Sequence, residues 1–223
     1  MLALGMIAAL AMPGTAQATP QLGDLGVKQS MSVKASNGES LEGKDLRAIQ
    51  LATYTAASVD GNTIVGYDLT TNTALASDIT AAAKAAGATD TNLTVNGKND
   101  PMVWVVKNLT DSRSDPWSGK LRNFCNSLAK QTNFAKQDGT AVSTLSQDKA
   151  TMSTGNALVP GIYAIVDRTP ATTTLSSGTA IKTTASIMMM NGTAVNGVNQ
   201  LRTAGGTTLT LGQVIYKEVG GQA

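Results

Sequence analysis

Residues 158–167, LVPGIYAIVD, decide the fold. Pro160 fixes its own φ ahead of a turn, and Gly161 is expected to supply a backbone conformation that other residues avoid. Residues 162–166 then carry one polar side chain, that of Tyr163, which is the pattern of a central strand buried on both faces. We therefore predict a turn that leads into a buried strand, with no catalytic group in it.

Strand patterns recur on both sides of this stretch, and a polar Gly/Ser/Thr stretch occupies residues 137–156. They lie at residues 26–36, 46–54, 62–69, 181–190 and 207–219, the last being one strand or a pair. The second of them, LRAIQLATY, alternates poorly and is predicted to begin with a bulge. It forms a hairpin with the third across Asp60-Gly61.

Three helices are predicted between these two groups of strands. The first covers about residues 74–86, and the second begins at Asp100-Pro101, with Asp100 as N-cap, and ends at Leu109. The third begins at Asp115-Pro116 and carries an apolar stripe made of Trp117, Leu121, Phe124, Cys125 and Leu128. The sequence thus predicts a mainly β (α+β) fold, a β-sandwich with a helical insertion at about residues 74–135.

The N-terminus is typical of an export signal. Residues 2–12 form a short apolar run, Pro13-Gly14 break it, and Ala16-Gln17-Ala18 matches the small-x-small rule of signal peptidase. We expect residues 1–18 to be a signal peptide and residues 19–223 to be the mature domain. The alternative is a buried N-terminal helix. The apolar run is too short to cross a membrane, and no later segment is expected to cross one.

Composition narrows the function classes. The chain has no histidine, which removes the commonest general base and transition-metal ligand, and its single cysteine cannot form an internal disulfide. The formal charge is +2 with scattered basic residues, so nucleic acid is not an expected partner. We expect a protein that is not an enzyme and that has no cofactor, no metal and no membrane span.

Four motifs, in this order, carry a resemblance to a known family. They are residues 41–44 (LEGK) leading to 48–54 (AIQLATY), residues 100–109, the Pro116-Trp117…Leu121-Arg122 helix, and residues 158–167. The chain resembles the N-terminal domain of sortase-assembled fimbrial (pilin) subunits of Gram-positive actinobacteria of the Bifidobacterium and Actinomyces type. The resemblance implies an immunoglobulin-like sandwich of the pilin and collagen-adhesin type.

The resemblance also implies a function. The chain would be a structural and adhesive subunit of a cell-surface pilus, secreted and anchored to the cell wall. Its partners would be other pilin subunits and sortase, together with a host glycan or an extracellular-matrix protein. No sorting signal is present and residues 220–223 look like the start of a linker, so a truncated product or the first domain of a longer protein is expected.

The family's covalent devices point to particular lysines. Lys217 falls near the position of the lysine that sortase joins to the next subunit, although no proline precedes it and no asparagine follows it. The alternative is a solvent-facing strand lysine. Lys28 and Lys34 are the candidate amines for an internal isopeptide bond. The last strand offers no Asn or Asp, and Asp167 replaces the usual Glu, so we expect no internal bond.

For the remaining candidate residues, a structural role stands beside each functional one. Cys125 is expected to be a small buried hydrophobe, and Trp104 and Trp117 to be core anchors rather than glycan platforms. Asp111, Asp115 and Asn108 could approach a calcium ion, but no calcium-binding loop is present. Two other functions stay open: a secreted carbohydrate- or protein-binding module outside fibres, and an enzyme such as a glycosidase with an acid pair.

Overall fold

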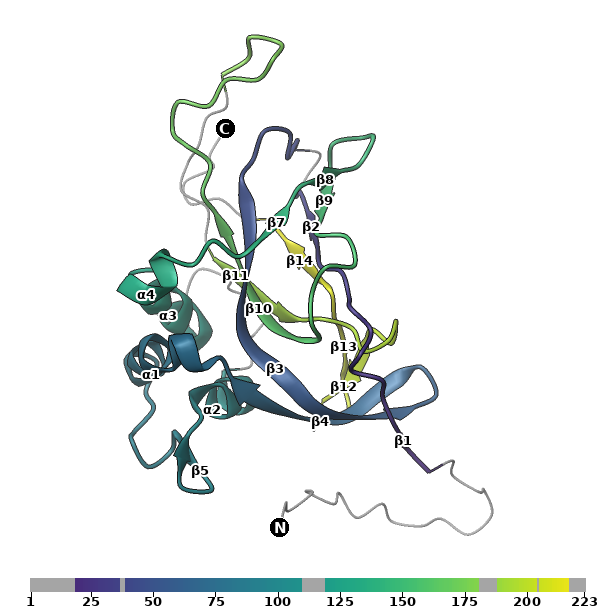
Figure 1. Ribbon diagram of the computed structural model, residues 1–223, viewed down its shortest axis with the longest axis vertical. Coiled ribbons are helices and arrows are strands. Elements are labelled where there is room, and N and C mark those ends of the chain that lie inside the picture. The colour runs from purple at the N-terminus through teal and green to yellow at the C-terminus, as the bar shows by residue number, and fades with distance from the viewer. Residues whose placement is uncertain (1–18, 37–38, 110–118, 181–187, 204, 217–223) are drawn as a thin grey trace.

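The computed structural model describes residues 19–36, 39–109, 119–180, 188–203 and 205–216. The protein is mainly β, with mixed sheets, and its helices gather on one side of the largest sheet (Figure 1). Within the described ranges, no helix is long and apolar enough to cross a membrane.

The largest sheet is built around one long central strand. In spatial order its strands are β11 (Met189–Gly192), β10 (Gly161–Asp167), β3 (Leu46–Asp60), β4 (Thr63–Thr71), β12 (Gln200–Arg202) and β13 (Thr208–Thr210). Two further strands, β1 (Gln21–Leu22) and β7 (Thr140–Val142), pair with β3. The β12–β4 pair is parallel and the other pairs of this sheet are antiparallel.

The predicted hairpin between β3 and β4 is confirmed, with Gly61 at its turn in a positive-φ conformation. The predicted bulge lies elsewhere. Against β10, Ala52 faces Ile162 and Gln50 faces Tyr163, so Leu51 is the extra residue. The bulge therefore sits within the predicted strand rather than at its start, and it lets Leu51 and Ala52 join the same core.

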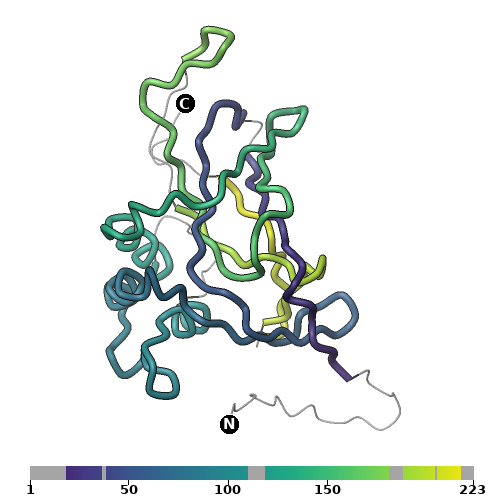
Figure 2. The backbone as a smooth tube through the Cα atoms, viewed as in Figure 1, coloured from purple at the N-terminus to yellow at the C-terminus, as the bar shows by residue number. Residues whose placement is uncertain are grey.

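A second, smaller sheet contains the second strand and the last strand of the described chain. Its order is β14 (Gln213–Ile215), β2 (Ser32–Lys34), β9 (Thr151–Ser153) and β8 (Thr144–Leu145). Strand β14 runs parallel to β2, and the tube in Figure 2 shows the yellow end of the chain beside its purple beginning. The described part of the predicted last strand, residues 207–216, thus supplies two strands in different sheets, separated by a positive-φ glycine, Gly212.

The helices lie between β4 and β7. They are the 3-10 helix η1 (Thr73–Leu75), α1 (Ala76–Ala85), α2 (Pro101–Asn108), α3 (Gly119–Leu128) and α4 (Thr132–Ala135), with a small hairpin of β5 (Thr94–Val95) and β6 (Lys98–Asn99). The first two predicted helices are confirmed by η1–α1 and α2. On α3, Phe124, Cys125 and Leu128 are buried as predicted. Trp117 and the Asp115-Pro116 start lie outside the described residues.

The cap of α2 differs from the prediction. Asp100 occupies the N-cap position, but its side chain makes no capping bond to the helix. Its carboxylate instead accepts hydrogen bonds from the backbone N–H of Thr71, at 2.9 Å, and from the Thr71 hydroxyl. Thr71 Oγ1 in turn accepts the N–H of Met102 at 3.0 Å, so a threonine from β4 caps the helix.

Strand β10 separates two hydrophobic cores. Ile162 and Ala164 belong to the core between the large sheet and the helices. Tyr163 and Ile165 belong to the core between the two sheets. Successive side chains of a strand point to opposite faces, so this alternation confirms the prediction that both faces of the strand are buried.

One set of strands in this part of the chain was not predicted, and one expectation was wrong. The polar stretch at residues 137–156 contains the short strands β7, β8 and β9, which bury Val142 and Met152. Gly161 does not adopt a left-handed conformation. It is needed because a Cβ at this position would lie 2.1 Å from the carbonyl oxygen of Ala52 on the neighbouring strand.

Candidate functional site

The lysines proposed for covalent chemistry do not form a site in the described structure. Lys217 lies outside the described residues. Lys28 and Lys34 are exposed. Lys34 is paired with Ile215 on β14 and with Thr151 on β9, neither of which carries an amide or a carboxyl group. The strand register therefore gives Lys34 no direct cross-strand partner for an isopeptide bond.

Lys34 instead contributes to the electrostatics of a surface turn. The pKa of Asp148 lies below its usual range, chiefly because its carboxylate accepts a hydrogen bond from the Ser146 hydroxyl. The backbone N–H of Ala150 adds to this, and the positive charge of Lys34 makes a smaller contribution. This arrangement organises the turn between β8 and β9.

A different lysine, Lys44, is buried and was missed by the sequence reasoning. Its side chain belongs to a residue only 9% exposed, and its Nζ lies 5.3 Å from the ring centroid of Tyr216. An ammonium group over an aromatic face at this distance is a cation–π contact. In the structure, Gly43 with φ 76° turns the chain just before Lys44.

Tyr216 joins this lysine to the end of β10. Its hydroxyl donates a hydrogen bond of 2.5 Å to Asp167 Oδ2. The other carboxylate oxygen, Oδ1, accepts the backbone N–H of Thr169 at 2.8 Å and also its hydroxyl. Thr169 Oγ1 then accepts the N–H of Asp45 at 2.8 Å. We call Lys44, Asp167, Thr169 and Tyr216 the C-terminal joint.

The chemistry of the C-terminal joint is that of an anchor. The Asp167 carboxylate accepts hydrogen bonds from three donors, which hold its orientation. Each donor comes from the chain itself, and the bond to Tyr216 fastens the residue that follows β14 to the large sheet. In the sequence, Asp167 stands only in place of the family's usual Glu, and the structure shows it bound to Tyr216.

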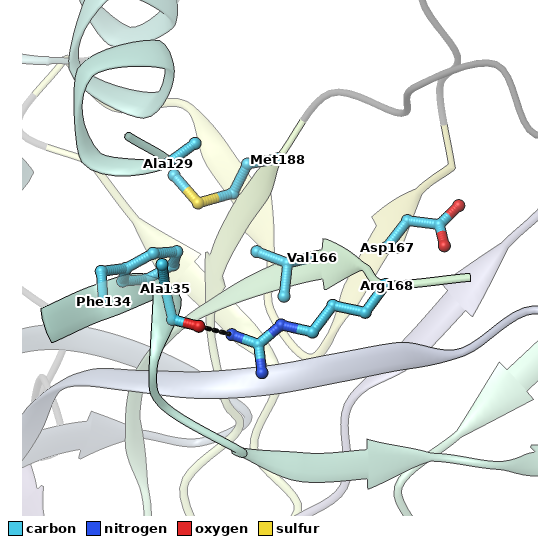
Figure 3. Close-up of a pocket in the computed structure, with 7 residues that line it drawn as sticks. All are labelled: Ala129, Phe134, Ala135, Val166, Asp167, Arg168 and Met188. Carbon is cyan, nitrogen blue, oxygen red and sulfur yellow. Dashed lines mark hydrogen bonds between the residues drawn. The ribbon is translucent and has the colours of Figure 1, made fainter. Parts of the chain in front are cut away.

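A pocket of about 230 Å³ lies next to Asp167, on the side of the helices. Figure 3 shows its seven lining residues: Ala129, Phe134, Ala135, Val166, Asp167, Arg168 and Met188. The Arg168 guanidinium donates hydrogen bonds to the carbonyl oxygens of Ala135, at 3.3 Å, and Gln137. The pocket therefore offers apolar side chains and a guanidinium already engaged with the backbone.

Arg122 is a second buried cation that the sequence reasoning missed. It is 8% exposed, lies on α3 and donates a hydrogen bond of 2.8 Å to the carbonyl oxygen of Met188. Its Nε is buried without a hydrogen-bond partner. The contact ties α3 to the residue preceding β11. In the sequence, Arg122 appears only as part of a fimbria-like motif, beside the apolar stripe of an amphipathic helix.

The other candidate residues that the structure describes pack in the core or bond to the backbone. Cys125 is buried, and Trp104 is partly buried against the helix-side core. The amide of Asn108 donates to the carbonyl oxygen of Trp104 at 2.8 Å. Asp111 and Asp115 lie outside the described residues. Over the part of the chain that the structure describes, no group of three or more His, Cys, Asp or Glu residues could hold a metal ion.

No family model matches the chain, and no significant match was found among curated proteins or solved structures. The resemblance to fimbrial subunits therefore stays a prediction.

Proposed function

We propose that this chain is a structural and adhesive subunit of a cell-surface pilus, exported and without enzymatic activity. We further propose that its two sheets form an immunoglobulin-like sandwich of the pilin and collagen-adhesin type, with the helices as an insertion. The order of the four fimbria-like motifs supports the proposal, as do the mainly β fold and the pairing of the first and last strands of the smaller sheet.

One observation carries the proposal furthest: the residue just before Lys217 is firmly anchored. The backbone N–H of Tyr216 donates to the carbonyl oxygen of Lys34 at 2.8 Å, and its hydroxyl donates to Asp167. An acceptor lysine in a transpeptidation reaction benefits from a backbone whose position is fixed. Lys217 is therefore our proposed intersubunit lysine.

The proposed reaction is an acyl transfer. Sortase holds the preceding subunit as a thioester on its own cysteine, and the neutral Nζ of Lys217 attacks the thioester carbonyl. An amide bond forms, the carbon–sulfur bond breaks, and the sortase thiol leaves with a proton released by the amine. The proposed assembly partners are thus sortase and other pilin subunits. The proposed receptor of the cell wall-anchored fibre is a host glycan or matrix protein.

The test uses the full chain, its cognate sortase and a peptide bearing the sorting motif. Intact mass measurement should detect one peptide adduct, and Lys217→Arg should abolish it. Lys34→Arg is the matched control, because Lys34 is an exposed lysine on the neighbouring strand. An adduct that survives Lys217→Arg would exclude this lysine, and no adduct with the unaltered chain would contradict the role of a sortase acceptor.

The pocket beside Arg168 favours one alternative, a secreted carbohydrate- or protein-binding module outside fibres. Phe134, Val166 and Met188 give it an apolar wall of the kind that a small ligand group can occupy. Binding to a glycan or matrix array that is lost in Met188→Lys, together with no sortase adduct, would favour this alternative.

A further inference from the structure

We propose that β2 and β14 form a mechanical clamp that resists force applied through the two ends of the chain. The proposal rests on the parallel pairing of these two strands. It goes beyond the proposed function and holds whether or not the chain is assembled into a pilus.

The direction of the two strands decides how force acts on them. Because β2 and β14 are parallel, Ser32 lies opposite Gln213 at one end of the pair and Lys34 lies opposite Ile215 at the other. Tension on the N-terminus leaves β2 at its Ser32 end, and tension on the C-terminus leaves β14 at its Ile215 end. The two pulls are therefore opposed along the strand axis, so they shear the pair rather than open it from one end.

Hydrogen bonds flank the pair at both of its ends. Ser32 donates its N–H to the carbonyl oxygen of Gly212 at 2.9 Å, and Tyr216 donates its N–H to the carbonyl oxygen of Lys34 at 2.8 Å. In a sheared ladder these bonds carry the load together, because none can lengthen without displacing the whole strand.

Strand β2 is held on its other side as well. It is an inner strand of the small sheet, with β9 as its second neighbour. The N–H of Met31 donates to Thr154 Oγ1 at 3.0 Å, and the N–H of Thr154 donates to the carbonyl oxygen of Met31 at 3.1 Å. Met31 and Val33 are fully buried, so sliding β2 would also move apolar side chains out of the core.

Strand β14 is fastened to the large sheet. Asn191 Nδ2 donates to the carbonyl oxygen of Gln213 at 2.8 Å. The N–H of Gly212 donates to the carbonyl oxygen of Gly192, also at 2.8 Å. At the other end of the strand, the Tyr216 hydroxyl is bound to Asp167. Force that enters through the C-terminus is thus passed to β10 and β11 as well as to β2.

The segment before β2 is held more weakly and is expected to yield first. Residues 19–30 are joined to the rest of the protein by the two residue pairs of β1 with β3 and by an isolated bridge between Gln29 and Leu158. Two further hydrogen bonds add to these, from the N–H of Gly23 to the carbonyl oxygen of Ala57 and from the N–H of Gly197 to Gln29 Oε1. Releasing these residues adds at most about 40 Å of extended chain. The clamp then becomes the next element in the path of the force.

The test is single-molecule pulling of the full chain in two attachment geometries. The first geometry uses handles at the N- and C-termini, which shears β2 against β14. The second uses a handle at the C-terminus and one at an exposed position after β2, through Glu39→Cys. Both handles of the second geometry act at the same end of the strand pair, so its residue pairs open one at a time. Cys125 is buried and is not expected to compete for the thiol-directed handle.

We expect the terminal geometry to require the higher unfolding force at the same loading rate. Three residue pairs make up the register, so loading them together rather than singly raises the force by at most about threefold. Equal forces in the two geometries, or a lower force through the termini, would overturn the clamp. The sequence of the strands is unaltered in both geometries, so the comparison does not depend on a destabilised variant.

A pair of proline variants then locates the effect. Ser32→Pro removes the N–H donor to Gly212 and is expected to bring the ratio of the two forces toward one. Thr144→Pro is the matched control, because it places a proline in β8, at the opposite edge of the same sheet. A ratio that falls equally in both variants would contradict the assignment to β2 and β14. Failure of sortase coupling at Lys217 would leave these results unaffected.

Discussion

Replacing Gly161 by alanine tests the account of why β10 can lie so close to β3. An added Cβ would sit 2.1 Å from the carbonyl oxygen of Ala52 and 3.0 Å from the Cα of Thr53, whereas ordinary contact begins at 3.4 Å. Both obstacles are backbone atoms of a central strand, so no side chain can rotate out of the way. The two strands would have to separate by more than about 1 Å at this point.

The cost follows from what that separation breaks. Overpacking alone typically costs about 1–3 kcal/mol. Three hydrogen bonds converge here: the N–H of Gly161 donates to Thr193 Oγ1, the N–H of Thr193 to the carbonyl oxygen of Gly161, and the N–H of Tyr54 to that of Pro160. At about 1 kcal/mol for each of the three bonds, the total loss is expected to be about 4–6 kcal/mol.

Urea unfolding followed by circular dichroism measures this loss, and a melting temperature lower by at least about 6 °C should accompany it. Gly66→Ala is the matched control, because Gly66 lies in strand β4 with no atom within 4 Å of its would-be Cβ. The control should be neutral or stabilising by up to about 1 kcal/mol. A Gly161→Ala protein within about 0.5 kcal/mol of the unaltered chain would refute the argument from close approach.

Three further changes probe the buried polar groups. Thr193→Val should cost about 1–3 kcal/mol in urea unfolding, because Thr193 is 0% exposed and its hydroxyl accepts the N–H of Gly161, whereas Thr193→Ser should retain most of the stability. Asp78→Ala should cost about 1–2 kcal/mol, since its carboxylate accepts the backbone N–H of Phe134 at 2.8 Å, and an unchanged unfolding midpoint would contradict this. Burial raises the pKa of three tyrosines above the unfolded-state value of 10.0. Their contribution to the free energy of unfolding is therefore complete below about pH 10 and is lost as the pH rises toward their folded-state pKa values. Tyrosinate absorbance from these residues that grows near about pH 10, before the protein unfolds, would contradict this prediction. These tyrosines are Tyr54, Tyr67 and Tyr163.

The sequence predicted elements where local pattern and tertiary setting agree. The apolar run at residues 162–166 reads as a doubly buried strand, and the Asp60-Gly61 turn reads as a hairpin, because each signal is contained within a few residues. The short strands β7, β8 and β9 were missed because their threonines and serines carry little hydrophobic pattern. Their pairing depends on β2 and β3, which lie far away in the sequence.

The candidate site was harder to predict for a related reason. A lysine or an arginine is expected at the surface, so nothing in composition marks Lys44 or Arg122 as buried. Lys44 is covered by Tyr216, from the other end of the chain, and Arg122 reaches the carbonyl oxygen of Met188 across the fold. Gly161 shows the same limit, since local reasoning assigned it to backbone conformation, whereas the constraint comes from Ala52 on a neighbouring strand.

The alternation along β10 makes the protein's two cores thermodynamically dependent on each other. Ile162 and Ala164 line one core and Tyr163 and Ile165 line the other, so detaching either the helical layer or the small sheet exposes half of the same strand. Partial melting is thereby penalised, and unfolding should be a single cooperative event. The amide protons of residues 162–165 should accordingly be among the slowest to exchange with deuterated solvent, at a rate set by global unfolding.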